Sequence, residues 1–328
     1  MKLGILGTGM IVQDFLTVAD KLKIDYLAIL STERSRQRTE ELAEKYHINK
    51  IYFDYDELLQ DKNLDTIYVA LPNFLHYQFA KKALLADKNV IVEKPGFTTF
   101  AEFNDLKKIS AEHDKILIEA TTTYYLPAFQ EIKKDLKNLG EIKIVSVNYS
   151  QYSSRYDAFK VGEILPAFDN KKAGGALMDI NFYNISFVVG LFGKPQKIFY
   201  SANVEKEIDT SGILILDYKN FKAVCIGAKD CKAPTTSTIQ GDAGNIFINI
   251  PANRIESYTI CDNEGGKELK IFTPDKHRMI FEFEKFIEMI DKHDVAKMNE
   301  MLEVSGIVAE ILQEAREQVG IIFPNDKI

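Results

Sequence analysis

The sequence contains few of the residues that indicate disulfide, metal or nucleic-acid chemistry. Its 328 residues include three cysteines, Cys225, Cys231 and Cys261, with no CxxC spacing, a set typical of free thiols in a reducing compartment. The five histidines are scattered and form no HxxxH or His/Cys cluster, so we expect no metal. The net charge of −7 disfavours nucleic acid or an anionic membrane as the main partner, because both attract basic surfaces.

Long apolar segments are also missing. We find no stretch long enough to span a bilayer. The N-terminal MKLGILGTGMIV contains three glycines and lacks an AxA-like cleavage site, so we do not interpret it as a signal peptide. Hydrophobic residues make up 46% of the chain and charged residues 27%, as in ordinary soluble globular proteins. We therefore expect a cytoplasmic protein.

The first part of the chain alternates strand and helix patterns. We expect strands at residues 2–6, 24–30, 51–53, 66–71, 90–92 and 116–119, and helices at 10–21, 36–46, 56–61, 75–86 and 100–113. Strands separated by helices at this rhythm, and apolar on both faces, predict a doubly wound parallel sheet with helices on both sides.

The pattern changes after residue 120. Strands are expected at 142–149, 196–204, 213–216, 222–226, 236–240 and 245–250, and closing helices at 279–291 and 296–320. Consecutive strands joined by turns predict an antiparallel or mixed sheet. We therefore expect two domains, 1–120 and 121–328, without a Gly/Ser linker or an internal repeat.

A glycine turn lies between the first strand and the first helix. Gly7 allows a tight turn, Gly9 allows close approach of a pyrophosphate, and the helix start offers free N–H groups and a positive dipole end. The expected cofactor-binding residues here are Gly7, Thr8, Gly9, Met10 and Ile11. Val12 stands where the usual pattern has its third glycine, and the alternative is a plain βα turn.

The second strand indicates the choice between NAD and NADP. An NAD site usually places an acidic residue at the end of this strand, but Ser31 and Thr32 stand there and Glu33 comes late. Arg34 follows, with two further arginines after it, so we expect a 2′-phosphate to be tolerated or favoured, and NADP rather than NAD. The alternative is a solvated helix start.

Polar residues also follow the fourth and fifth strands. NVIVEKPG at residues 89–96 runs from a buried strand into Glu93, Lys94 and a proline. Strands of such a sheet end at the edge where the cofactor lies, so Lys94 is expected beside the nicotinamide; the alternative is an ion pair at a strand end. Further cofactor contacts are expected from Leu71, Pro72, Asn73 and His76, although His76 also suits a solvent-facing helix start.

A helix is expected at residues 176–189 in the second domain. Its apolar residues cover most of the circumference, which predicts a buried helix. Asp179, Tyr183 and Ser186 share one polar stripe. A polar stripe on a buried helix needs partners or a cavity, so it lines either a substrate pocket or a structural network.

Taken together, several segments make the chain resemble the Gfo/Idh/MocA family of nicotinamide-dependent oxidoreductases, in particular its glucose-fructose oxidoreductase and dihydrodiol dehydrogenase branches. The matching segments are GILGTGM at 4–10, LPNFLH at 71–76, EKP at 93–95, EATTTYYLP at 119–127, GGALMDINFYNISFVVGLFG at 174–193 and GIIFPND at 320–326. The resemblance implies a Rossmann domain and an α/β domain with an open, mainly antiparallel sheet that often forms the interface of a homodimer or homotetramer. It implies sugars, polyols or related cyclic alcohols and ketones as substrates.

The resemblance also assigns roles to residues. It maps the family's catalytic lysine onto Lys94, and its Asp-x-x-x-His onto Asp179 and Tyr183. The tyrosine is a departure that speaks against an inositol-dehydrogenase-like branch. A second departure is Tyr124, where many members have arginine; we expect Tyr124 to contact the substrate.

These assignments predict reversible hydride transfer with Lys94 and Tyr183 in proton transfer and Asp179 orienting them. Arg155, in a loop rich in tyrosine and serine, is expected to meet an anionic group of the substrate, although a bland loop fits equally. Two alternatives remain: a dinucleotide-binding sensor without turnover, and a reductase of a non-sugar carbonyl such as a dihydrodiol or a biliverdin-like compound.

Overall fold

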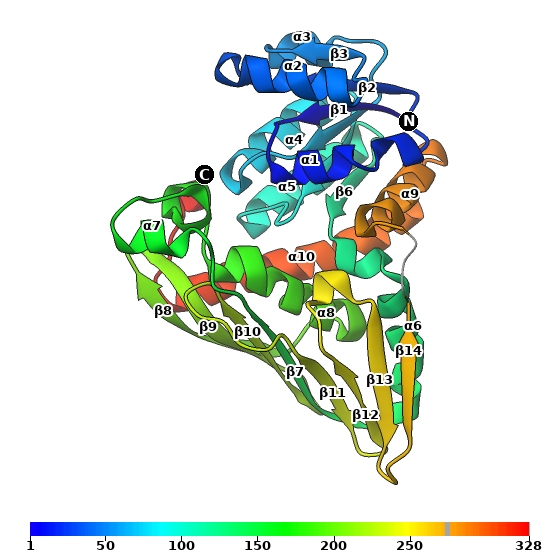
Figure 1. The fold of residues 1–328 in the computed structure, drawn as a ribbon, viewed down its shortest axis with the longest axis vertical. Helices are drawn as coiled ribbons and strands as arrows, with labels where there is room; N and C mark the ends of the chain where they lie inside the picture. The colour runs from blue at the N-terminus through cyan, green and yellow to red at the C-terminus, as the bar shows by residue number, and fades with distance from the viewer. Residues whose placement is uncertain (273–275, 328) are drawn as a thin grey trace. The chain divides into compact units, whose positions relative to one another are not determined.

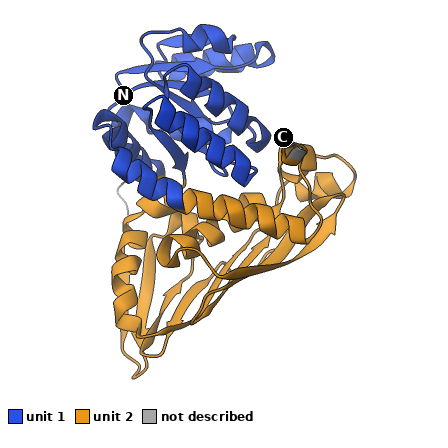
Figure 2. Cartoon of the chain, turned by 180° about the vertical axis from the view of Figure 1, so that it is seen from behind, with its two compact units in different colours: residues 1–120, 279–303 blue, residues 121–278, 304–328 orange. Residues whose placement is uncertain are grey.

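The computed structural model describes residues 1–272 and 276–327, which divide into two compact units (Figure 2). Unit 1 consists of residues 1–120 and 279–303, and unit 2 of residues 121–278 and 304–328. The first unit thus ends where the sequence pattern changes. The expected second domain, 121–328, does not form one compact unit, because residues 279–303 belong with the first.

Unit 1 contains a six-stranded parallel sheet with the strand order β3-β2-β1-β4-β5-β6 (Figure 1). This is the order of a Rossmann fold, in which ligands lie at the carboxyl ends of the strands. The strands are β1 (Lys2–Leu6), β2 (Tyr26–Leu30), β3 (Lys50–Tyr52), β4 (Thr66–Val69), β5 (Asn89–Glu93) and β6 (Leu117–Ala120). The helices between them are α1 (Met10–Leu16), α2 (Arg36–Lys45), α3 (Tyr55–Leu59), α4 (His76–Leu85) and α5 (Phe100–Glu112).

The first helix is shorter than its sequence pattern predicts. We expected a helix to about residue 21, but α1 ends at Leu16 and a separate 3₁₀ turn follows at Ala19–Lys21. Thr17 accounts for the end: its hydroxyl donates to the Asp14 carbonyl at 2.6 Å, and its N–H is shared between the Gln13 and Asp14 carbonyls. Side-chain bonds of this kind compete with regular helix continuation.

Helix α9 (Arg278–Asp291) joins the core of unit 1 through an aromatic cluster. The ring of Phe283 lies 4.4 Å from Phe15 of α1 and 5.3 Å from Tyr68 of β4, between ring centroids. The start of α10 (Val295–Gln318) is bound to the same unit, because the Met298 sulfur accepts from Ser110 and from the Leu117 N–H. These long-range contacts explain why residues 279–303 pack with the first unit.

Unit 2 contains an eight-stranded sheet with the order β14-β13-β12-β11-β7-β10-β9-β8. Six of its seven pairings are antiparallel, and β7 pairs with β10 in parallel. The strands are β7 (Ile142–Ser150), β8 (Lys197–Glu205), β9 (Ile208–Asp217), β10 (Lys222–Ala228), β11 (Ser237–Gly241), β12 (Gly244–Ile248), β13 (Ser257–Asp262) and β14 (Lys267–Ile271). The mainly antiparallel sheet is confirmed, but the sequence pattern missed β13 and β14.

One face of this sheet is covered by helices of the same unit. α6 (Pro127–Asp135) reaches β13, where the Tyr258 hydroxyl donates to Asp135 at 2.6 Å. A π-helical turn (Leu177–Asn181) leads into α8 (Phe182–Phe192), which lies on β10. The Asn181 and Asn184 amides donate to the Cys225 and Ile226 carbonyls at 3.2 and 2.8 Å. The buried helix expected at 176–189 is therefore present, but its first turn is wider than an α-helix.

The opposite face of the sheet, which we call the open face, carries large apolar side chains. Phe199, Ile215 and Val224 are successive neighbours across three strands, and Ile213 lies opposite Ile226. The exposed fractions of Phe199 and Ile213 are 55% and 48%. Further exposed apolar side chains on this face are Ile144, Phe247, Leu269 and Ile271.

One helical stretch, Asn170–Phe192, is long and apolar enough to cross a membrane by length and composition alone. Our sequence analysis expected no such segment. However, 72% of its most apolar window is buried inside the structure. Its amides bind β10, as described above, and a core helix of a globular unit meets the same length and composition criteria.

Candidate active site

The glycine turn of unit 1 has the geometry of a phosphate cradle. Gly7 follows β1 with φ of +105°, and a Cβ there would lie 2.8 Å from the Ala70 carbonyl oxygen, so only glycine fits. Gly9 is the N-cap of α1, and a Cβ built on it would meet nothing within 4 Å. Thr8 and Gly9 precede α1, and Met10 and Ile11 begin its first turn. The N–H groups of a first helical turn have no acceptor within the helix. These residues fit the pyrophosphate of a dinucleotide.

The end of β2 offers hydroxyls and an arginine to a ligand. Ser31 and Thr32 directly follow the strand, and Arg34 is exposed in the short 3₁₀ turn after them. The Glu33 carboxylate is held by Arg36 through two hydrogen bonds of 2.8 and 2.9 Å. The hydrogen bonds to Arg36 lower the pKa of Glu33. Glu33 is thus engaged with Arg36, and Ser31, Thr32 and Arg34 stand just beyond the carboxyl end of β2.

The segment after β5 is fixed by buried carboxylates. Glu93 is only 8% exposed and accepts a hydrogen bond from the Tyr68 hydroxyl of β4, and its other oxygen lies 3.2 Å from the Lys94 N–H. The Gly96 N–H donates to Glu119 at 2.7 Å. Glu93, which we expected to bind the cofactor, is therefore held within the sheet. Lys94 is partly exposed at the carboxyl edge.

His76 ties two of the expected cofactor segments together. Its ring nitrogens lie 2.9 Å from the Pro95 carbonyl oxygen and 2.6 Å from the Leu71 carbonyl oxygen. The residue is 1% exposed, and burial lowers its pKa, while the two carbonyls act in the opposite direction. The solvent-facing alternative from the sequence is therefore wrong, and the cofactor contact expected of His76 stays a prediction. His76 instead holds the segment of Leu71, Pro72 and Asn73 against the turn that carries Lys94.

In unit 2, polar residues gather at the ends of the two parallel strands. Tyr149 lies near the end of β7, opposite Gly227 of β10, and Lys229 follows directly after β10, two residues beyond Gly227. The ring of Tyr183 lies 6.3 Å from that of Tyr149, between centroids. The Asp179 carboxylate accepts from the Lys229 ammonium at 2.7 Å. Asp179 and Tyr183 are partly exposed, so both can meet a ligand at this edge.

Three other residues singled out in the sequence lie in unit 2 as follows. Tyr124 is 5% exposed, and its ring packs on Phe129 and on Gly190 of α8, so it lies in the core of unit 2, while the substrate contact expected of it stays a prediction. Ser186 is fully buried, so the polar stripe that reaches the surface consists of Asp179 and Tyr183 alone. Arg155 is the N-cap of a short helix, α7 (Tyr156–Lys160), and remains partly exposed.

Lys229 is the residue of this cluster that sequence reasoning missed. It stands alone after a strand, and nothing local distinguishes it from a surface lysine. Only the packing of the π-helical turn Leu177–Asn181 against β10, about fifty residues away in the sequence, places Lys229 beside Asp179. No group of three or more His, Cys, Asp or Glu suited to a metal ion occurs among the residues that the structure describes.

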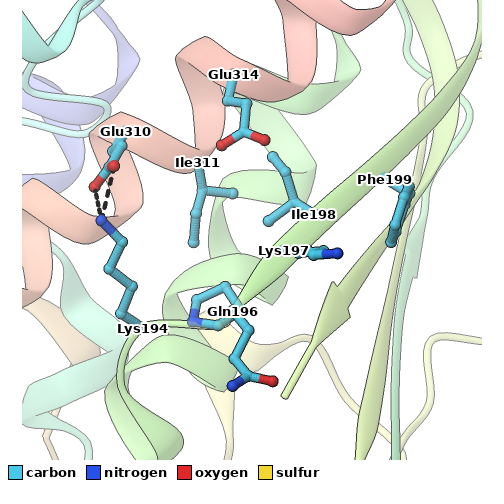
Figure 3. A pocket seen from close by; sticks show the side chains of 9 residues that line it. Lys194, Gln196, Lys197, Ile198, Phe199, Glu310, Ile311 and Glu314 are labelled. Carbon is cyan, nitrogen blue, oxygen red and sulfur yellow. Dashed lines mark hydrogen bonds and ion pairs between the residues drawn. The ribbon is translucent and has the colours of Figure 1, made fainter. Parts of the chain in front are cut away.

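A surface pocket of about 390 Å³ lies elsewhere in unit 2, between the start of β8 and the second half of α10 (Figure 3). Lys194 and Glu310 form an ion pair at its rim, with the Lys194 nitrogen 2.6 Å from a Glu310 oxygen. Both side chains are exposed by more than a third, so the pair is screened by water. None of the residues expected in the active site lines this pocket.

Comparison with known proteins is consistent with this arrangement. Residues 1–121 match the family model described as an oxidoreductase family with an NAD-binding Rossmann fold, and residues 129–247 match the GFO/IDH/MocA C-terminal domain. Several curated relatives extend over the whole chain. The scyllo-inositol 2-dehydrogenase (NADP(+)) IolU of Bacillus subtilis is 34% identical over 100% of this chain and 99% of its own. The trans-1,2-dihydrobenzene-1,2-diol dehydrogenase of mouse is 27% identical over the same shares.

The fold also matches a solved structure, KijD10, a 3-ketoreductase of Actinomadura kijaniata in complex with NADP. Its TM-score is 0.85 at 19% identity, covering 97% of each chain. Other structures of that protein carry a lysine replaced by alanine or glutamate, or a tyrosine replaced by phenylalanine. The name of the Bacillus relative speaks against our inference from Tyr183 that the chain lies apart from inositol dehydrogenases.

Proposed function

The chain belongs to the Gfo/Idh/MocA family of NAD(P)-binding oxidoreductases, and from this premise we propose that it interconverts a cyclic polyol and its ketone with NADP. The observation that carries the proposal is the position of Lys94, directly after β5 at the same sheet edge as the glycine cradle. Membership of this family, with relatives named as dehydrogenases along the whole chain, favours an enzyme over a sensor.

The preference for NADP is supported by the end of β2. A 2′-phosphate needs hydrogen-bond donors and a cation, and Ser31, Thr32 and Arg34 supply both. The carboxylate that would compete for the ribose hydroxyls, Glu33, is paired with Arg36. The relative from Bacillus subtilis is also named as NADP-dependent.

We propose the following roles for the residues of the site. A nicotinamide cofactor, when held at the glycine cradle, would supply a reversible hydride acceptor for the carbinol carbon of the substrate. The hydroxyl proton passes to the Lys94 Nζ or to the Tyr183 Oη during oxidation and returns from there during reduction. The Asp179 carboxylate accepts a hydrogen bond from a substrate hydroxyl and so orients the carbinol. The variant Tyr183→Phe distinguishes the two possible proton carriers. If this variant keeps full turnover, Lys94 is the remaining proton carrier.

A trans-dihydrodiol is the second candidate substrate. It is favoured by the full-length relatives that are named dihydrodiol dehydrogenases. Both candidates are secondary alcohols with a neighbouring hydroxyl, so the same residues would serve either one. The distinction therefore rests on measurement.

We further propose that the protein is a cytoplasmic homodimer or homotetramer joined through the open face. The centre of this face is apolar, around Phe199, Ile213 and Ile215. Its rim is charged, with a 2.6 Å ion pair between Lys222 and Asp217. An apolar centre inside a polar rim is the usual anatomy of a protein interface, and exposed apolar patches of this kind mark contact surfaces.

The experiment is an absorbance assay of nicotinamide reduction. Purified protein is incubated with NADP⁺ or NAD⁺ and with scyllo-inositol, myo-inositol, glucose or a trans-dihydrodiol. We expect turnover with a cyclic polyol and a higher kcat/KM for NADP⁺ than for NAD⁺. Preference for NAD⁺ would contradict the cofactor assignment, and turnover of the dihydrodiol alone would replace the polyol by the second candidate.

A further inference from the structure

Lys229 is a buried cation at the edge of the candidate site. Its side chain is 2% exposed, whereas that of Asp179 is 41% exposed. Its ammonium donates to Asp179 at 2.7 Å and to the Ala167 carbonyl at 3.1 Å, and lies 4.8 Å from the centre of the Phe168 ring. The lysine therefore approaches Asp179 from inside the unit, while the carboxylate faces outward.

A buried ammonium is costly unless it is paired and hydrogen-bonded. Lys229 has few possible partners. A second carboxylate that interacts electrostatically with Lys229 is Asp209 of β9, which already accepts from the Leu177 N–H at 2.6 Å and from the Tyr200 hydroxyl at 2.9 Å. Burial raises the pKa of Asp209, against the opposing effect of its hydrogen bonds and of Lys229. Asp179 is consequently the carboxylate that neutralises Lys229 by direct contact.

The backbone around Asp179 is also fixed. Asp209 caps the start of the π-helical turn, and a Cβ on Gly175 would lie 2.1 Å from an Asp209 oxygen. At the other side, a Cβ on Gly227 would lie 2.6 Å from the Asn181 Cβ, so the turn rests directly on β10. π-helical turns of this kind often occur at functional sites. The turn holds the Asp179 main chain, and Lys229 holds its side chain.

We propose that Lys229 is a positioning residue for the reaction: its ammonium fixes the Asp179 carboxylate, in the ionised state, in the direction from which it accepts a hydroxyl of the substrate. This inference rests on the proposed function, because it takes Asp179 as the group that meets the substrate. The ionised carboxylate is an acceptor only, so it selects a substrate with a free hydroxyl at that place.

The test compares four variants with the wild type: Lys229→Met, Lys229→Arg, Asp179→Asn and the double variant Lys229→Met/Asp179→Asn. Lys206→Met is the matched control, because Lys206 also donates to a backbone carbonyl and lies over a phenylalanine ring, but its bonds go to Phe159 and Lys160. Each protein is assayed with NADP⁺ and scyllo-inositol across pH, and its affinity for NADPH is measured by fluorescence.

We expect Lys229→Met to lower kcat/KM for the polyol by about 100-fold, the usual effect of losing the orientation of a reacting group. NADPH affinity should stay within about twofold, and Lys229→Arg should recover part of the loss.

The groups facing Lys229 are Asp179, Asp209 and, at the next residue, Asp230, which is held by the Thr210 and Ser211 hydroxyls. Without the ammonium, Asp179 takes up a proton at higher pH, so the acid limb of the pH profile should move up by about one pH unit or more.

The double variant decides whether Lys229 acts through Asp179. We expect it to be no slower than Asp179→Asn alone, because the lysine then has nothing to position. Additive losses would overturn the inference, as would an unchanged pH profile in Lys229→Met.

A second readout does not depend on turnover. The free energy of unfolding in urea, measured for the same four variants, gives the coupling between Lys229 and Asp179. A coupling close to zero would overturn the inference even if no substrate is turned over. Absence of turnover in the wild type, with strong coupling intact, would instead contradict the proposed function.

Discussion

The two sheets of this protein differ in how their faces are covered. The six-stranded sheet of unit 1 has helices on both faces, and its strands β1, β2, β4, β5 and β6 are almost entirely buried. The eight-stranded sheet of unit 2 has helices on one face, and its open face presents Phe199, Ile213 and Ile215 to the surroundings. The apolar surface of the sheet in unit 1 is therefore covered within the unit, whereas part of the apolar surface of the sheet in unit 2 stays exposed.

The two units also place their polar residues by the same rule. In unit 1, the glycine cradle and Lys94 follow the carboxyl ends of parallel strands. In unit 2, Tyr149 and Lys229 lie at the carboxyl ends of β7 and β10, which are its one parallel pair among the described strands. Adjacent parallel strands end at one edge, so side chains that are remote in sequence come together there. The two sheets thus differ in how their faces are covered, but both carry polar residues at the carboxyl ends of parallel strands.

The largest effect should come from the edge of unit 1. Lys94→Ala removes a group that we propose for proton transfer, and kcat should fall by roughly 10²- to 10⁴-fold, the range for general acid–base catalysis. The matched control is Lys108→Ala on α5, where the lysine makes an exposed pair with Glu112 at 3.7 Å. A kcat for Lys94→Ala within threefold or so of the control would remove Lys94 from the mechanism.

The next effect concerns the open face of unit 2. Ile215→Asp places a charge at the centre of the apolar patch and should weaken the proposed oligomer strongly, because burying an unpaired charge costs several kcal/mol. The measurement is mass by light scattering during size-exclusion chromatography. Leu85→Asp is the control, since Leu85 is an exposed apolar residue at the end of α4 in unit 1. A wild type that is monomeric, or an Ile215→Asp variant that keeps the oligomer, would show that this face has another role.

Much of this comparison could be predicted from the sequence. The six strands of unit 1 read as short apolar runs between helical patterns, because a parallel sheet is buried on both faces. Gly7, Gly9 and Lys94 follow such runs directly, so their place at the edge follows from the pattern. β13 and β14 were missed because their residues are polar or half-exposed, with burial patterns that do not alternate clearly.

Long-range contacts explain what the sequence could not predict. His76 was placed near the cofactor, but its burial depends on two carbonyls, one before it and one nineteen residues later. The Tyr124 ring packs against Gly190, and Lys229 contacts Asp179 because the π-helical turn packs on β10. Neither contact can be recognised from the neighbouring residues in the sequence. The π-helical turn at Leu177–Asn181 likewise depends on Asp209, which caps it from another strand.

A smaller effect is expected from the tie within unit 1. His76→Phe removes the ring nitrogens from the Pro95 and Leu71 carbonyls, so the free energy of unfolding should fall by about 1–3 kcal/mol, the cost of leaving buried polar groups unsatisfied. His113→Phe is the control, because His113 makes a more exposed 3.0 Å contact with Asp87. Urea unfolding measures both variants. If the two variants lose the same stability, His76 does not hold the two segments together.

The smallest expected effect is the contribution of Asp209 to the pH dependence of the free energy of unfolding. Burial raises the pKa of Asp209 in the folded protein, so the folded state binds its proton more tightly than the unfolded state. Asp209 therefore adds to the free energy of unfolding at a pH below its pKa in the unfolded chain, about 3.9. This contribution is lost as the pH rises through its higher pKa in the folded protein. Asp209→Asn should remove that loss, so the free energy of unfolding of the variant should fall less than that of the wild type as pH rises above about 4.

The control for this prediction is Asp217→Asn in the same strand, β9, where the aspartate pairs with Lys222 near the surface. Unfolding in urea is followed from acid to neutral pH for all three proteins. If the free energy of unfolding changes equally with pH in Asp209→Asn and in the wild type, Asp209 binds no extra proton in the folded state.

The transfer of hydrogen itself is the most direct test of the function proposed for these two edges. Scyllo-inositol carrying deuterium on its ring carbons is incubated with NADP⁺ and the wild-type protein, and the reduced cofactor is analysed by mass spectrometry. Hydride transfer from a carbinol carbon predicts NADPH that is heavier by one deuterium, at a single face of the nicotinamide ring. Reduced cofactor without deuterium would contradict the account, because the hydride would then come from a source other than the polyol carbon.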